Sequence, residues 1–132
     1  YGVVKNKTGI IDKPIGLRAG SVRRTAFVRR AKMVKEAITS YTVQKAFTIK
    51  NTAVSLLQVK PLTGRTHQIR VHLALIGHPV VGDIVYGPKK QPLLLTRHFL
   101  HADSLEFSLS NGRHMKIAAD LPEELVHLVN QA

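Results

Sequence analysis

Side chains that could bind a ligand or support chemistry crowd into one stretch of the chain, residues 62–87. A Thr-Gly turn signal opens this stretch, and five polar or charged residues follow it within eight positions: Arg65, His67, Gln68, Arg70 and His72. An apolar run to Ile76 accompanies them. Polar groups beside apolar residues are costly to bury without partners, so a functional site explains this stretch better than packing alone.

The residue types in and around this stretch do not favour a metal or cofactor site. The chain has seven histidines and no cysteine, and no histidine pair stands in an HExxH pattern. Residues 61–66 lack the spacing of a nucleotide-hydrolysing phosphate loop. Backbone N–H groups at a helix start could still contact an RNA phosphate there, with Arg65 alongside. We therefore expect neither metal nor cofactor.

Carboxylates are scarce, and only Asp83 lies within the stretch. Its Gly-Asp context is typical of a turn-forming, hydrogen-bonding Asp. Arg70 stands among apolar residues, where a partly buried Arg requires a carboxylate partner. The sequence shows no obvious partner, so we expect it in a part of the protein outside this chain.

Charge indicates the kind of partner. The 132 residues hold 20 Lys and Arg against 8 Asp and Glu, a net charge of +12. This excess favours nucleic acid first and an acidic membrane surface second, although no apolar run approaches the ~20 residues of a membrane span. Seven cations precede the first nearby acid, Glu36, and form either a segment that binds a polyanion or a solvated basic loop: Arg18, Arg23, Arg24, Arg29, Arg30, Lys32 and Lys35.

The element that positions the central side chains is predicted to be a helix over residues 66–76. Thr66 can cap its start, and Gly77 followed by His78-Pro79 is a strong stop signal. On such a helix His67 and Arg70 lie three positions apart and share a face. A strand would fit the apolar spacing too, but the length and the end signals favour helix.

The remaining periodicity predicts a mixed α+β domain with a largely antiparallel sheet and a few packed helices. Residues 37–47 and 52–60 alternate as a pair of strands joined by a turn at 49–51. Further strands are predicted at 2–5, 25–28, 99–109 and 114–118, and a last helix begins near Leu121. The length suits one domain or part of a larger one.

Two central motifs resemble the signature of the RluA-type family of RNA pseudouridine synthases. They read GRTHQIRVHL at 64–73 and GHPVVGDIVYG at 77–87. Shorter matches extend across the chain: GIIDKPI at 9–15, KEAITSY at 35–41 with Val34 where the family has Gly, LHA at 100–102 with Leu105 and Phe107, and ADLP at 119–122. The resemblance implies an isomerase that converts uridine in RNA to its carbon-linked isomer without a cofactor.

The resemblance also implies roles for individual residues. The family nucleophile is an Asp in an upstream HRLD-T-S-G motif, which this chain lacks, and Arg70 matches the Arg that pairs with that Asp. Leu100 matches an apolar wall of the base pocket. Tyr1 falls one residue after the family's active-site Tyr. The residues implied to contact RNA are Arg18, Arg23, Arg24, Arg29, Arg30, Arg65, His67, Lys89 and Lys90.

We therefore expect residues 1–132 to be the C-terminal part of a single pseudouridine synthase catalytic domain, inactive without its upstream part. The whole protein is expected to be cytoplasmic and monomeric and to act on structured rRNA or tRNA. Two alternatives remain open. One is a non-catalytic RNA-binding module of the same fold, and the other is a phosphate-binding hydrolase using Asp83 with His67 or His78. Helix capping and core hydrogen bonding are the ordinary alternative for His67 and His72.

Overall fold

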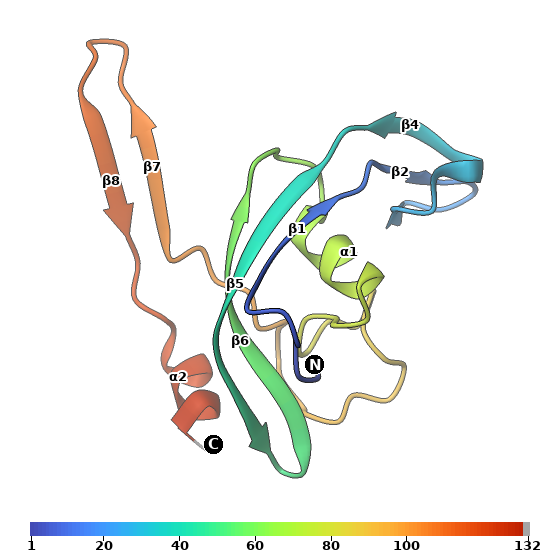
Figure 1. The fold of residues 1–132 in the computed structure, drawn as a ribbon, viewed down its shortest axis with the longest axis vertical. Helices are drawn as coiled ribbons and strands as arrows, with labels where there is room; N and C mark the ends of the chain where they lie inside the picture. The colour runs from blue at the N-terminus through green and yellow to red at the C-terminus, as the bar shows by residue number, and fades with distance from the viewer. Residues whose placement is uncertain (131–132) are drawn as a thin grey trace.

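The computed structural model describes residues 1–130, in which three small antiparallel sheets and two α-helices form an α+β architecture (Figure 1). The sheet orders are β1-β5-β6, β3-β2-β4 and β7-β8. The bounds are β1 Thr8–Asp12, β2 Ile15–Arg18, β3 Arg24–Thr25, the 3-10 turn η1 Val28–Arg30, β4 Ala31–Lys35, β5 Ile38–Ile49, β6 Thr52–Pro61, α1 Gln68–Leu75, β7 Ser104–Ser108, β8 His114–Ala118 and α2 Glu123–Asn130.

The long hairpin of β5 and β6 confirms the predicted strand pair. Tyr41 pairs with Val59, and Gly9 of β1 lies on the other side of Tyr41. The two turn residues, Lys50 and Asn51, both have positive φ, at 45° and 64°. Such a two-residue turn matches the right-handed twist of the strands it joins.

Helix α1 packs on one face of this sheet, as period-two alternation along the strands requires. Ile11, Tyr41 and Leu73 are buried together at this contact. Half-buried apolar residues from β5, β6, α1 and the later loops surround them, including Phe99 and Leu100. This cluster is aliphatic apart from Tyr41 and Phe99, as expected for a chain without Trp.

The predicted helix is confirmed, but its predicted cap is wrong. The N-cap is His67, at φ 57°, and not Thr66. No side chain caps the helix start; instead the Gln68 amide holds the turn before it, because its Oε1 accepts the Thr63 hydroxyl (2.7 Å) and the Arg65 N–H (3.0 Å). At the other end Gly77 has φ 82°, and the His78 N–H reaches the Leu73 carbonyl at 2.9 Å, which is a Schellman ending.

His72 connects the helix to the sheet. It has the core hydrogen-bonding role that the sequence offered as the alternative to a functional one. Its ring is fully buried. Nε2 lies 2.8 Å from the Lys13 carbonyl and Nδ1 lies 2.8 Å from the Thr39 hydroxyl. Since a carbonyl only accepts, Nε2 donates to Lys13, and the Thr39 hydroxyl can pair with Nδ1 as donor or acceptor. Both ring nitrogens therefore have a hydrogen-bond partner.

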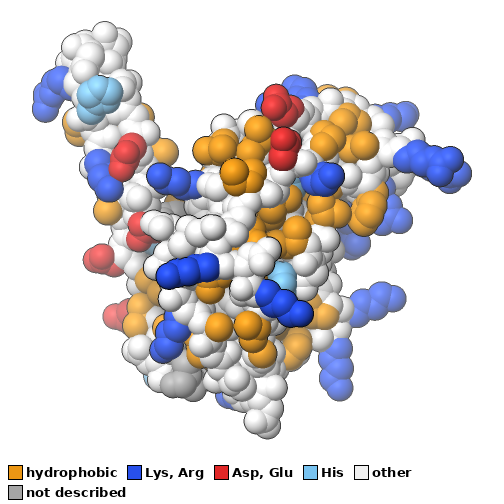
Figure 2. All heavy atoms as spheres, in the orientation of Figure 1, with side chains coloured by type: hydrophobic (Ala, Val, Ile, Leu, Met, Phe, Trp, Pro, Cys, Tyr) orange, Lys and Arg blue, Asp and Glu red, His pale blue; other side chains and the backbone are white. Residues whose placement is uncertain are grey.

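Residues 15–35 form a small sheet beside this body, which we call the basic arm (Figure 1). The predicted strand at 25–28 is misplaced, since β3 ends at Thr25 and a 3-10 turn occupies Val28–Arg30. Strand β4 was not predicted, because its residues lack alternating burial. Lys and Arg side chains gather on the side of the molecule where the arm lies (Figure 2).

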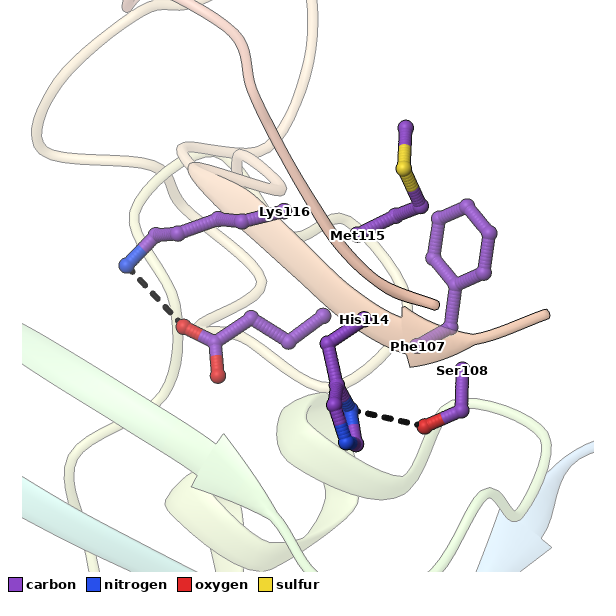
Figure 3. Close-up of a pocket in the computed structure, with 6 residues that line it drawn as sticks. Phe107, Ser108, His114, Met115 and Lys116 are labelled. Carbon is purple, nitrogen blue, oxygen red and sulfur yellow. Dashed lines mark hydrogen bonds and ion pairs between the residues drawn. The ribbon is translucent and has the colours of Figure 1, made fainter. Parts of the chain in front are cut away.

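The β7–β8 hairpin extends away from the rest of the chain (Figure 1). Strand β8 is confirmed over its predicted residues, whereas β7 is shorter than predicted. Phe107 lies opposite Met115, and the neighbouring pairs are Glu106–Lys116 (2.9 Å) and Ser108–His114 (2.9 Å); these six residues line a shallow hollow (Figure 3).

The predicted strand at residues 2–5 is wrong. This segment runs beside β6, but it forms no ladder with it. The Gly2 N–H reaches the Ala53 carbonyl at 2.8 Å, whereas the Val4 N–H bonds the Ser55 hydroxyl at 3.0 Å. A side chain thus takes the place of the backbone acceptor that a strand would need.

Candidate active site

An ion pair between Arg70 and Asp83 is the centre of the site. The Arg70 Nε donates to Asp83 Oδ2 at 2.7 Å, and Nη2 donates to Oδ1 at 2.8 Å. The Asp83 side chain is fully buried and that of Arg70 is 12% exposed. Two parallel charge-assisted bonds fix the guanidinium in position and in plane.

This pair corrects the expectation that the chain offers Arg70 no carboxylate partner. Asp83 lies 13 positions downstream, beyond the end of α1, so no helical spacing connects the two residues. The one sequence feature that could have identified this partner is that Asp83 is the single acid in the central stretch. Its predicted turn-forming role is confirmed as well, so the same carboxylate pairs with Arg70 and holds its own loop.

The loop from Gly82 to Gly87 is built to hold that carboxylate. The backbone N–H groups of Val85 and Tyr86 donate to Asp83 Oδ1 at 2.9 and 3.0 Å. Gly82 has φ 76°, and a side chain there would approach the Arg97 carbonyl oxygen to 2.5 Å. A residue with a Cβ at position 82 would therefore be strained and would displace the loop.

Tyr86 connects this pair to the helix start and to the basic arm. Its ring lies under the Arg70 guanidinium, 5.0 Å from centroid to Cζ. Its hydroxyl lies 3.0 Å from His67 Nδ1 and accepts the Arg24 backbone N–H at 3.0 Å. Tyr86 was not among the predicted site residues. The ion-pair clamp, as we call Arg70, Asp83 and Tyr86, therefore includes one residue that only the structure identifies.

Protonation states follow from this arrangement. Burial raises the pKa of the Asp83 carboxyl, but hydrogen bonds from Arg70 and from the Tyr86 and Val85 N–H groups outweigh it and lower the pKa from 3.8 to about 2. Burial and the positive Arg70 lower the pKa of both His67 and His98. At neutral pH the site therefore holds one cation, one anion and two neutral imidazoles.

The arrangement leaves part of the guanidinium available. Nε and Nη2 are used by Asp83, whereas among the described residues no acceptor is bonded to Nη1. An Arg held this way can hold a second anionic group, but it cannot transfer protons at neutral pH. The Asp83 carboxylate is buried and engaged by four donors, so it has no free oxygen for use as a general base. This weighs against the hydrolase alternative.

The other predicted residues are placed around the clamp or outside it. His67 joins the clamp through Tyr86, whereas His78 bonds the Tyr1 carbonyl at 2.9 Å. The Arg65 Nε donates to the Glu36 carbonyl at 2.8 Å. Leu100 is half-buried and packs against the main core, in a cluster that does not include the clamp residues. The predicted RNA contacts that are exposed are Arg18, Arg23, Arg29, Arg30, His67, Lys89 and Lys90, whereas Arg24 and Arg65 are half-buried.

Two negative findings apply to residues 1–130. No group of three or more His, Asp or Glu side chains is arranged to hold a metal ion within that range. Over the same residues, neither helix has the length and apolar character needed to cross a bilayer.

The chain is similar to proteins that are named RNA pseudouridine synthases. The sequence model described as RNA pseudouridylate synthase matches residues 1–75, more than half of the chain. An uncharacterized RNA pseudouridine synthase of Mycobacterium bovis is 42% identical over 124 residues, which cover 91% of this chain and 38% of the relative. Ribosomal large subunit pseudouridine synthase D of Nitrosomonas europaea is 38% identical over 131 residues, covering 93% of this chain and 36% of the relative.

A solved structure agrees with these sequence matches. Human RNA Pseudouridylate Synthase Domain Containing 1 superposes with a TM-score of 0.81 and 29% identity, covering 94% of this chain and 53% of that protein. The chain thus spans about two fifths of the length of these curated relatives. With the motifs, the fold and the family match in agreement, the chain belongs to the RluA-type family of RNA pseudouridine synthases.

Proposed function

We propose that the protein containing this chain converts uridine to pseudouridine within structured rRNA or tRNA. The observation that carries the proposal is the clamped Arg70, which lies in the family motif and whose Nη1 has no acceptor among residues 1–130. Two relatives are named ribosomal large subunit pseudouridine synthases, C and D, which favours rRNA. In this proposal residues 1–132 are the C-terminal part of the catalytic domain.

The proposed role of Arg70 is to hold the nucleophilic Asp that the family carries upstream of the residues seen here. An adjacent cation keeps a carboxylate ionised and oriented, as a nucleophile must be. Asp83 already neutralises part of the Arg70 charge and fixes its plane. The guanidinium then acts as a bridge between a buried structural carboxylate and a reactive one.

RNA must bring its uridine to that pair. A base inside a helix cannot be reached, so the nucleotide is turned out of the stack at a cost of ~a few kcal/mol. The exposed arginines of the basic arm, with Lys89 and Lys90, would hold phosphates on either side. Arg65 and His67 would border the entrance, and Leu100 would supply an apolar wall for the base.

The test is the pseudouridine content of RNA incubated with the complete protein, with Arg70→Ala and with Arg70→Lys. We expect a loss of at least about 100-fold in rate for both variants, the scale of losing one preorganised charged donor. Lys cannot reproduce two parallel bonds and a third contact. Unchanged isomerisation by both variants would refute the assignment of Arg70.

A companion measurement separates the alternatives. The 132-residue chain alone should not isomerise uridine, because the proposed nucleophile lies outside it, and activity of the chain alone would contradict this. If the complete wild-type protein binds RNA but produces no pseudouridine, the chain belongs to a non-catalytic RNA-binding module of the same fold.

A further inference from the structure

An aromatic side chain stands exposed on the basic arm, close in sequence to a residue of the active-site core. Phe27 is 78% exposed and belongs to none of the apolar clusters of the described residues. Val22 in the same arm is 90% exposed. An aromatic ring exposed to water carries an unfavourable hydration free energy. It indicates a contact surface when the residues around it suit one class of partner.

The backbone holds Phe27 in place while its neighbour anchors it. Ala26 packs against the buried cluster of Ile15, Ala37 and Val71, to which Tyr86 also belongs as a half-buried member. The Phe27 N–H donates to the Thr25 hydroxyl at 3.0 Å, which fixes the turn between β3 and η1. Phe27 is therefore next in the chain to a residue that packs against the same buried cluster as Tyr86 of the ion-pair clamp.

The surroundings of Phe27 are cationic. Arg23, Arg29 and Arg30 are exposed within four positions of it, and no acid occurs between Asp12 and Glu36. Cations repel one another unless a polyanion neutralises them. An aromatic ring among arginines matches the combination that binds nucleic acid, in which phosphates meet the arginines and a base stacks on the ring.

We propose that Phe27 stacks on an RNA base next to the uridine that enters the active site. The inference rests on the proposed function and adds a contact to it. Removing a uridine from its stack exposes the faces of the neighbouring bases, and an apolar side chain that covers one of these faces offsets part of that cost. The link from Arg24 to Tyr86 places the arm beside the clamp, where such a contact is useful.

The experiment uses the complete protein with Phe27→Ala and Phe27→Trp. Two RNA substrates are compared, a stem in which the target uridine is stacked and a short unstructured oligonucleotide. The stem also carries 2-aminopurine next to the target, whose fluorescence falls when it stacks. Phe107→Ala, on the β7–β8 hairpin, is the matched aromatic control.

We expect Phe27→Ala to lower kcat/KM on the stem by about 5- to 100-fold, the scale of one base–aromatic stack, and to abolish the fluorescence quenching. Phe27→Trp should retain both, and the unstructured substrate and the control should change less than twofold. Equal kcat/KM and quenching for Phe27→Ala and wild type would overturn the proposal, as would a loss of binding to phosphatidylserine vesicles with RNA binding unchanged.

Failure of the proposed function has a different result. If wild type does not isomerise uridine but Phe27→Ala alone removes the 2-aminopurine quenching, the stacking contact stands and the catalytic assignment fails. Thermal unfolding of each variant checks the fold, and little change is expected because the Phe27 ring is mostly in solvent.

Discussion

The ion-pair clamp and the basic arm differ in how their charges are balanced. In the clamp, the Asp83 carboxylate is fully buried and receives bonds from one guanidinium and two backbone N–H groups. In the arm, exposed arginines stand without acidic neighbours in sequence. The clamp holds a complete arrangement before any substrate arrives, whereas the arm has charges that only a polyanion can neutralise.

This difference indicates that the clamp fixes the positions of the reacting groups and that the arm supplies electrostatic attraction to RNA. Reaction rates depend on groups held in place before the reaction, so the clamp should tolerate little change. Salt-dependent affinity depends mainly on the number of cations that reach phosphates, so the arm should tolerate many single changes. The predictions below test this contrast, beginning with the largest effect.

Replacing Asp83 should produce the largest loss. Asp83→Ala leaves a nearly buried Arg70 without its partner, and breaking a buried pair on one side costs about 3–5 kcal/mol. Urea unfolding of the complete protein measures this cost. The control is Glu106→Ala, which removes the exposed pair with Lys116 on the hairpin and should leave the unfolding midpoint unchanged. Equal midpoints for the two variants would show that the clamp is not the stabilising centre.

Acid should weaken the clamp in a defined window. The pKa of Asp83 is lowered from 3.8 to about 2 in the folded chain, so the folded state favours the ionised form. The resulting stabilisation, roughly 2 kcal/mol, is fully present above pH 4 and is lost as pH falls through about 2. Unfolding measured from pH 5 to 2 should show this slope in wild type and not in Asp83→Asn. The same slope in both proteins would assign the acid sensitivity elsewhere.

The arm should respond to salt and not to denaturant. Arg29→Ala and Arg30→Ala each remove one exposed cation, and each should reduce the slope of log affinity against log salt for RNA by about 0.7–0.9. Their free energies of unfolding should stay within about 0.5 kcal/mol of wild type. Arg113→Ala, an exposed change on the distant hairpin, is the control. An unaltered slope for both arm variants would remove the arm from the RNA interface.

Sequence patterns predicted the elements best where local signals and burial agreed. The hairpin of β5 and β6 and the ending of α1 at Gly77 followed from alternation and stop signals. The cap at Thr66 was wrong because the helix begins after His67, and the Gln68 amide binds the Ile38 carbonyl and the Thr39 hydroxyl of β5, long-range contacts that no local spacing rule describes. Strand β4 escaped prediction because it is an exposed strand whose Met33 has φ 51°.

The site was predicted in part for the same reason. Arg70 was identifiable from its motif and from the need of a buried cation for an acid. Its partnership with Asp83 depends on a loop that returns to α1 after Gly82, and Gly82 lies so close to the Arg97 backbone that a side chain there would clash. Tyr86 is identified as a site residue only by the structure, in which its hydroxyl contacts both His67 and the Arg24 N–H.

Tyr86→Phe tests the connection between the two regions and should give the smallest effect. The ring stays under Arg70, so the clamp keeps its aromatic contact, but the hydroxyl that accepts the Arg24 N–H is lost. One hydrogen bond of this kind contributes about 1 kcal/mol. Hydrogen exchange of the Arg24 amide should become faster, whereas the amides of α1 should keep their protection. If α1 amides also lose protection, the arm and the clamp unfold as one cooperative unit. The two regions would then differ in their roles in catalysis and RNA binding, but not in stability.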